Sequence, residues 1–129
     1  MEYRRDETRV YLVVYHLVWT PKRRKAVLLG AVAKDCEKLI REKCAVRGWE
    51  VLELSVQSDH LHLFVSVFPS VAPSEVVKEC KGVTARELRR KYPDLLKLPS
   101  MWTRSYFAAT AGNVSQETIA RYIADQRGR

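Results

Sequence analysis

The chain has 129 residues, enough for one compact domain but too few for two of ordinary size. Because 47% of its residues are hydrophobic, we expect a packed core, and the composition excludes a disordered chain. The formal net charge of +8 indicates a polyanionic partner, either a nucleic acid or an anionic membrane surface.

The sequence also excludes several classes of protein. No apolar run approaches the roughly 20 residues of a membrane-spanning helix, and the charged residues 1–9 lack the apolar stretch of a secretory signal. We therefore expect a cytoplasmic protein with a short solvated N-terminal arm. Three cysteines without a CxxC motif favour neither a disulfide framework nor a structural zinc site, and we interpret them as small core residues.

The first half of the chain predicts a strand, a basic loop and a helix. Residues 11–19 are rich in Val, Tyr and Leu, which is typical of a buried strand, and residues 20–25 (Thr-Pro-Lys-Arg-Arg-Lys) form the loop. Apolar residues then recur at helical spacing from about Gly30 to Arg47, and Gly48 is a suitable helix stop.

Two further strands and a second helix follow. Residues 49–56 alternate between apolar and polar side chains, and residues 61–67 form another strand after a short connection, so we expect a hairpin or near-hairpin. Pro73 suits the first turn of a helix, whose apolar spacing continues to about Lys91.

The C-terminal part predicts one more strand and one more helix. Pro93 and Pro99 bracket a loop, residues 104–110 form the strand, and Ser115 is an N-cap for a helix over residues 115–126. The β-α-β-β-α-β order with a C-terminal helix predicts a single α+β domain of the ferredoxin-like, or RRM-like, type. Such a domain has an antiparallel four-stranded sheet with two helices on one face.

His60 and His62 form the first feature that carries chemistry. On a strand, residues two apart point to the same face, so the two imidazoles project together while Leu61 and Leu63 point to the core. Such a pair can share one metal cation, although two exposed or core-edge histidines are the ordinary alternative. Two of the only three histidines stand here beside the carboxylate of Asp59, which favours the metal.

Tyr122 and Gln126 form the second feature. They are four residues apart on the expected C-terminal helix, so they lie on one face. A carboxamide oxygen can complete a coordination shell begun by two histidines, and a phenol can attack a phosphodiester that a metal polarises. The alternative is a surface tyrosine that packs beside Ile119.

Positive charge gathers in two clusters, and we expect both to contact nucleic-acid phosphates. A solvated helix face is the ordinary alternative. The clusters comprise Lys22, Arg23, Arg24 and Lys25 in the loop, and Lys78, Lys81, Arg86, Arg89, Arg90 and Lys91 on the second helix. The remaining histidine, His16, lies mid-strand, and we interpret it as structural or as a group that supports the metal ligands.

Together these residues closely resemble the single-tyrosine transposases of the IS200/IS605 insertion-sequence family, which belong to the HUH nucleases. The resemblance is collinear from about Val10 to Gln126, and the Trp-Thr-Pro segment and the terminal Tyr-Ile-x-x-Gln make it specific. It rests on His16-Leu17-Val18-Trp19-Thr20-Pro21-Lys22-Arg23-Arg24-Lys25, Asp59-His60-Leu61-His62-Leu63, Lys81-Gly82, Trp102-Thr103-Arg104-Ser105-Tyr106-Phe107 and residues 115–126.

The resemblance implies a mechanism and a set of partners. His60 and His62 would bind Mg²⁺ or Mn²⁺ with Gln126 as a third protein ligand. Tyr122 would attack a phosphate of single-stranded DNA, forming a 5′-phosphotyrosine and releasing a 3′-OH. The family works as an obligate homodimer, in which the last helix can place its tyrosine against the histidines of the other subunit, and it recognises subterminal DNA hairpins. Asp59 as a further ligand or supporting group is our own hypothesis.

Other functions stay open at this point. A domesticated relative would act on chromosomal repeat palindromes, and the genomic context would distinguish it from the enzyme of a mobile element. A non-catalytic RNA-binding module on an RRM-like sheet predicts exposed aromatic residues on the central strands, where this chain has histidines. A structural metal-binding protein is a weaker alternative, because two histidines and an amide make a poor permanent site.

Overall fold

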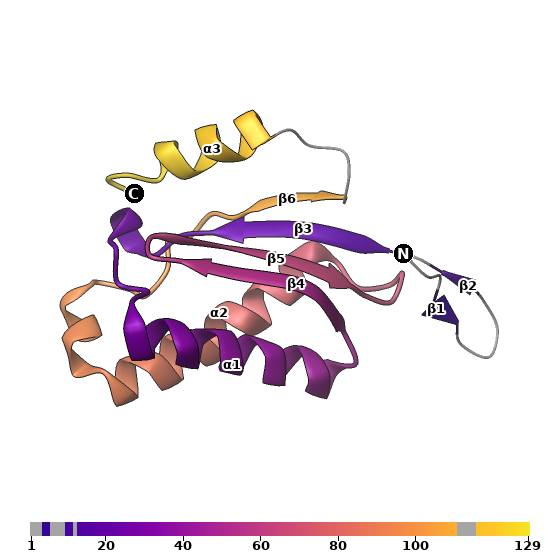
Figure 1. Cartoon of the computed structure of the whole chain (residues 1–129), viewed down its shortest axis with the longest axis horizontal. Coiled ribbons are helices and arrows are strands. Elements are labelled where there is room, and N and C mark those ends of the chain that lie inside the picture. Colours follow the sequence, from indigo (N-terminus) through magenta and orange to yellow (C-terminus); the bar gives the residue numbers. More distant parts are fainter. Residues whose placement is uncertain (1–3, 6–9, 12, 111–115) are drawn as a thin grey trace.

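A four-stranded antiparallel sheet lies at the centre of the protein, with its strands in the order β4-β5-β3-β6 (Figure 1). These strands are β3 (Val14–Trp19), β4 (Glu50–Gln57), β5 (His60–Ser66) and β6 (Phe107–Thr110). A two-stranded ladder of β1 (Arg4–Arg5) and β2 (Val10–Tyr11) precedes them. The computed structural model describes residues 4–5, 10–11, 13–110 and 116–129.

Helices lie on both faces of the sheet. α1 (Gly30–Arg47) and α2 (Pro73–Lys91) cover one face, and α3 (Gln116–Asp125) lies over the other (Figure 1). The core fills the space between the sheet and the first two helices, where Ile40 and Leu63 are 0% exposed. The element order and the two helices on one face confirm the expected ferredoxin-like α+β fold. No helix in the described part of the chain has the length and apolar character needed to cross a membrane.

The two long helices begin and end where the sequence predicts. Gly48 follows α1 with a φ of 77°, a left-handed conformation that glycine adopts without steric cost, and it ends the helix. Pro73 occupies the first turn of α2, where its missing N–H is not needed. The three cysteines are buried and free, as expected of core residues.

The structure differs from the prediction in the shorter elements. The N-terminal arm is not wholly irregular, because β1 pairs with β2, and β3 begins only at Val14, where its pairing with β5 begins. Two expected loops contain short turns of 3-10 type, η2 (Pro93–Lys97) and η1 (Lys22–Arg24), and in η1 the backbone of Arg23 departs from helical angles. The expected N-cap Ser115 lies outside the described residues.

The last strand is also shorter than expected. β6 begins at Phe107, and before it the carbonyls of Thr103 and Ser105 accept hydrogen bonds from the Lys81 side chain. Residues 103–105 therefore form a short connecting segment at the edge of the sheet, and this segment contacts α3.

Candidate active site

The central strand β5 presents its two histidines on the face of the sheet that α3 covers. Leu61 and Leu63 are fully buried on the opposite face, whereas His60 and His62 are partly exposed, which agrees with the expected alternation. The two imidazole rings lie nearly perpendicular, with their centroids 5.0 Å apart. We call this side of the sheet the histidine face.

Both histidines are held through the same ring nitrogen. Nδ1 of His60 lies 2.8 Å from Oδ1 of Asp59, and Nδ1 of His62 lies 3.1 Å from Nε2 of His16. Among the described residues, neither Nε2 has a hydrogen-bond partner. The arrangement therefore orients two imidazoles with their Nε2 atoms available for a ligand, as is usual where histidine binds a metal.

Asp59 links this pair to the basic loop. Its second oxygen, Oδ2, lies 3.0 Å from Nε of Arg24, and both the Arg24 and Asp59 side chains are mostly buried. Arg23 and Arg24 have φ values of 58° and 54°, a conformation that non-glycine residues seldom adopt. Because both carboxylate oxygens of Asp59 are engaged, the geometry favours the supporting role that we considered for it.

Helix α3 brings Tyr122 to the same face. The Tyr122 ring centroid lies 6.0 Å from that of Phe107, whose ring is 6.4 Å from His16, and His16 in turn contacts His62. The phenol oxygen lies 2.9 Å from Oγ of Ser105. Burial raises the pKa of Tyr122, and the hydrogen bond with Ser105 offsets part of that rise.

Gln126 lies beside Tyr122, as the four-residue spacing predicts, and its side chain is buried. Its Oε1 accepts hydrogen bonds from Ser105 Oγ at 2.8 Å and from Thr103 Oγ1 at 3.3 Å, and its Nε2 donates to the Tyr122 carbonyl. The carboxamide oxygen thus has two protein donors here. Metal binding by Gln126 stays a prediction, and it requires the oxygen to exchange a hydroxyl partner for the cation.

The sequence did not single out Ser105, and it assigned Lys81 to DNA. Nζ of Lys81 donates to the Thr103 carbonyl at 2.7 Å and to the Ser105 carbonyl at 2.9 Å, and burial lowers its pKa to about 8. One sequence signal was available, because Lys81 stands four residues after the buried Val77 and three before the buried Thr84. Lys81 therefore braces the segment that contacts α3, and its interaction with DNA stays a prediction.

The other expected DNA contacts lie on two sides of the molecule. Arg23 and Lys25 are exposed on the loop next to the histidine face, where Lys22 and Arg24 are partly buried. The remaining candidates lie on α2, across the sheet from the histidines. There Lys78 is exposed, Arg86 and Arg90 both pair with Glu87, Arg89 donates to the Leu98 carbonyl at 2.9 Å, and Lys91 pairs with Asp35.

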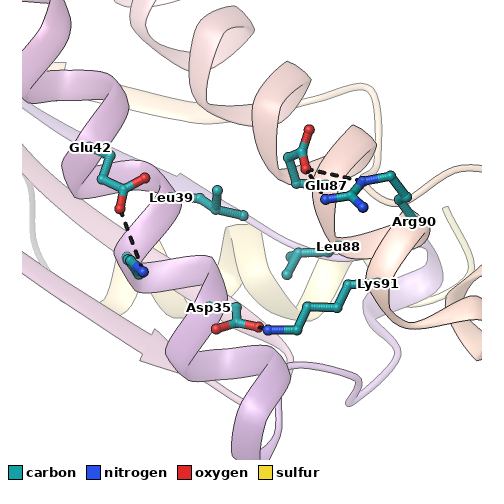
Figure 2. Close-up of a pocket in the computed structure, with 8 residues that line it drawn as sticks. Asp35, Leu39, Glu42, Glu87, Leu88, Arg90 and Lys91 are labelled. Carbon is teal, nitrogen blue, oxygen red and sulfur yellow. Dashed lines mark hydrogen bonds and ion pairs between the residues drawn. The ribbon is translucent and has the colours of Figure 1, made fainter.

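A shallow groove of about 170 Å³ lies between α1 and α2 (Figure 2). Its apolar floor includes Leu39 and Leu88, and charged side chains line its rim. Lys91 reaches across it to Asp35 at 2.8 Å. The groove belongs to the helical layer, on the other side of the sheet from Tyr122, and we do not assign it to the active site.

Comparison with known proteins identifies a consistent set of relatives. A family model described as "Transposase IS200 like" matches residues 9–126. The ISDra2 transposase TnpA of Deinococcus radiodurans is 33% identical over 132 residues, which cover 100% of this chain and 94% of that protein. The transposase for insertion sequence element IS200 of Salmonella typhimurium is 26% identical over 115 residues, covering 87% and 75%.

Solved structures of transposases also resemble this chain. The crystal structure of a putative transposase from Deinococcus radiodurans R1 superposes with a TM-score of 0.89 at 30% identity, covering 98% of this chain and 99% of that one. A REP-associated tyrosine transposase bound to a REP hairpin gives a TM-score of 0.58 at 16% identity, covering 95% and 68%, and this likeness concerns the fold alone.

Proposed function

The chain belongs to the family of IS200-like transposases, and from this premise we propose that it cleaves and rejoins single-stranded DNA at the ends of an insertion sequence. In this proposal Tyr122 attacks a phosphodiester and forms a 5′-phosphotyrosine, while His60 and His62 hold a divalent cation. The observation that carries the proposal is the position of Tyr122 over the histidine face, to which Phe107 and His16 connect it.

We propose Mg²⁺ or Mn²⁺ as the cation. Because Nδ1 of each histidine has a partner, Nε2 is the available atom of each ring. Mn²⁺ accepts imidazole together with oxygen ligands, which water and Gln126 can supply. A divalent cation in this place would neutralise charge on the phosphate oxygens, and two neutral imidazoles leave its full charge available for that purpose.

The chemical step exchanges one phosphate ester for another. As Tyr122 Oη bonds to phosphorus, the bond between phosphorus and the DNA 3′ oxygen breaks. The phenol gives up one proton and the departing oxygen takes up one to leave as a 3′-OH, so the step consumes no net proton. Burial raises the pKa of Tyr122, so the phenol needs a proton acceptor. Ser105 Oγ can accept the hydrogen bond of the phenol and so orient it, while the proton itself passes to solvent water, to which the partly exposed Tyr122 has access. The phosphate bond is retained on the protein, so an incoming 3′-OH can reverse the reaction and rejoin the DNA.

We propose hairpin-bearing single-stranded DNA as the partner. The exposed Arg23 and Lys25 would contact phosphates next to the histidine face, and the basic surface of α2 would extend the contact across the molecule. We also propose a homodimer, in which α3 of one subunit can serve the histidines of the other. In support of this, α3 lies at the surface of the domain (Figure 1), where Tyr122 contacts Ser105 and Phe107.

Two alternatives are distinguishable. A repeat-associated enzyme would carry out the same chemistry on chromosomal palindromes, so it differs in its DNA substrate only. A non-catalytic RNA-binding module would need an open sheet face with aromatic rings for stacking. The histidine face does carry Phe64 and Phe107 beside the histidines, but it lies under α3 and is not open (Figure 1).

The test is to incubate the protein with labelled hairpin-bearing single-stranded DNA and Mn²⁺ or Mg²⁺. We expect a covalent protein–DNA adduct that chelation of the metal prevents. His60→Ala and His62→Ala should abolish the adduct and keep most of the DNA affinity in a gel-shift assay. Adduct formation that persists without metal, or DNA binding that disappears with the histidines, would contradict the proposed role of the pair.

A further inference from the structure

We propose that His16 is a positioning residue that holds His62 in the tautomer required for metal binding. In this inference Nε2 of His16 accepts a hydrogen bond from the Nδ1–H group of His62. Nε2 of His62 then carries no proton, so its lone pair would be available to a cation. The inference rests on the proposed function, since it concerns the same two-histidine site.

The geometry leaves His16 little freedom. Its Nε2 lies 3.1 Å from Nδ1 of His62, and the two rings are 5.3 Å apart with an angle of 26° between their planes. On β3 it pairs in register with Phe64, against whose ring it stacks at 4.1 Å and 15°, and the edge of Phe107 closes another side. Because only 5% of its surface is exposed and aromatic rings lie beside it, the His16 ring has little room to turn.

The chemistry explains why a histidine stands at this point of the strand. A phenylalanine would stack on Phe64 equally well, so packing alone does not require a polar ring. A neutral imidazole that binds a metal through Nε2 carries its proton on Nδ1, and that N–H needs an acceptor when it is buried. Asp59 provides the acceptor for His60, and His16 occupies the equivalent place for His62.

The two supports differ in charge. Asp59 is also paired with Arg24, whereas His16 supplies a neutral acceptor from the centre of the sheet. Removal of such an outer hydrogen-bond partner typically costs about 10- to 100-fold in metal affinity. We therefore expect His16 to set the affinity of the site for the cation without touching the cation or the DNA.

The experiment compares two substitutions in the intact chain without DNA. His16→Phe removes the hydrogen-bond acceptor but keeps an aromatic ring against Phe64. His16→Gln replaces the acceptor Nε2 of His16 by a carboxamide oxygen, which can accept the same hydrogen bond from His62. Mn²⁺ affinity is measured by electron paramagnetic resonance, and the tautomer of His62 by ¹⁵N NMR of the metal-free protein. Thermal melting confirms that each variant is folded.

We expect the parent protein to hold His62 as the Nδ1–H tautomer. His16→Phe should move His62 toward the Nε2–H tautomer and weaken Mn²⁺ binding by about 10- to 100-fold, and His16→Gln should retain both parent properties. An Nε2–H tautomer in the parent protein overturns the inference even if no variant folds. It is also overturned if His16→Phe binds Mn²⁺ as the parent does, or if the two folded variants lose affinity equally. A parent protein that binds no Mn²⁺ contradicts the proposed metal site itself.

Discussion

The hydroxyl of Ser105 connects the proposed nucleophile to Gln126, and its removal should loosen α3 without unfolding the domain. Oγ lies 2.9 Å from Oη of Tyr122 and 2.8 Å from Oε1 of Gln126. In Ser105→Ala both contacts disappear, and Gln126 keeps one hydroxyl donor, Thr103, at the longer distance of 3.3 Å. The substitution therefore weakens the attachment of α3 to the segment before β6.

The size of the effect follows from burial. One hydrogen bond contributes about 1 kcal/mol net, and a buried acceptor that loses a partner costs about 1–3 kcal/mol. Gln126 is 3% exposed but retains Thr103, and Tyr122 is partly exposed and can turn to water, so we expect the lower part of this range. A loss of about 1–2 kcal/mol changes the ratio of docked to undocked α3 by about 5- to 30-fold.

Hydrogen exchange followed by mass spectrometry measures this directly. Peptides from residues 116–129 should exchange about 5- to 30-fold faster in Ser105→Ala, and peptides from α2 should be unchanged. Ser100→Ala is the matched control, because its hydroxyl bonds the Trp102 carbonyl and does not contact α3. Unchanged exchange in α3 of Ser105→Ala, or equal acceleration by Ser100→Ala, would refute this reasoning.

Three further predictions follow from the charged groups. Lys81→Met should lower the free energy of unfolding, measured in urea, by about 2 kcal/mol, because two backbone carbonyls lose their hydrogen-bond donor. The exposed control Lys78→Met should change it by less than about 0.5 kcal/mol. Equal losses in the two variants would contradict the stabilising role of Lys81. Burial, together with the positive charge that His60 and His16 can carry, lowers the pKa of His62 from its ordinary value of 6.5 to about 4 in the folded protein. As the pH falls, the unfolded chain therefore takes up a proton at His62 before the folded protein does. The stability of the metal-free protein should therefore fall as the pH drops from 6.5 toward 4, with a smaller slope in His62→Gln, and an identical slope would count against this assignment. The logarithm of the binding constant for single-stranded DNA should fall with the logarithm of the salt concentration, and Arg23→Ala should make this slope shallower by about 0.7. Lys38→Ala on α1 is the control and should leave the slope unchanged. Equal slopes in the two variants would exclude the loop as a phosphate contact.

The parts of the fold that the sequence predicts well are those with a local cause. Helix α1 ends where Gly48 permits a left-handed residue, and α2 begins at Pro73. The shared face of His60 and His62 follows from strand alternation alone. Each of these features depends on residues within one or two turns of chain, so pattern and propensity suffice to predict them.

The supporting residues of the site depend on contacts between distant parts of the chain. His16 and His62 are 46 residues apart, and Ser105 and Tyr122 are 17 apart, so no local pattern brings either pair together. Lys81 is a clearer case, because its partners are backbone carbonyls that any residue type supplies. Its charge indicated DNA, and only the folded structure reveals that it faces the segment before β6.

The most direct test of the central claim is to locate the covalent bond. The protein is incubated with hairpin-bearing single-stranded DNA and Mn²⁺, the adduct is digested with nuclease and protease, and the peptide that carries the residual nucleotide is sequenced by mass spectrometry. We predict a phosphotyrosyl linkage at Tyr122, which Tyr122→Phe abolishes while DNA binding persists. A linkage at any other residue, or an adduct of undiminished yield in Tyr122→Phe, would contradict the account.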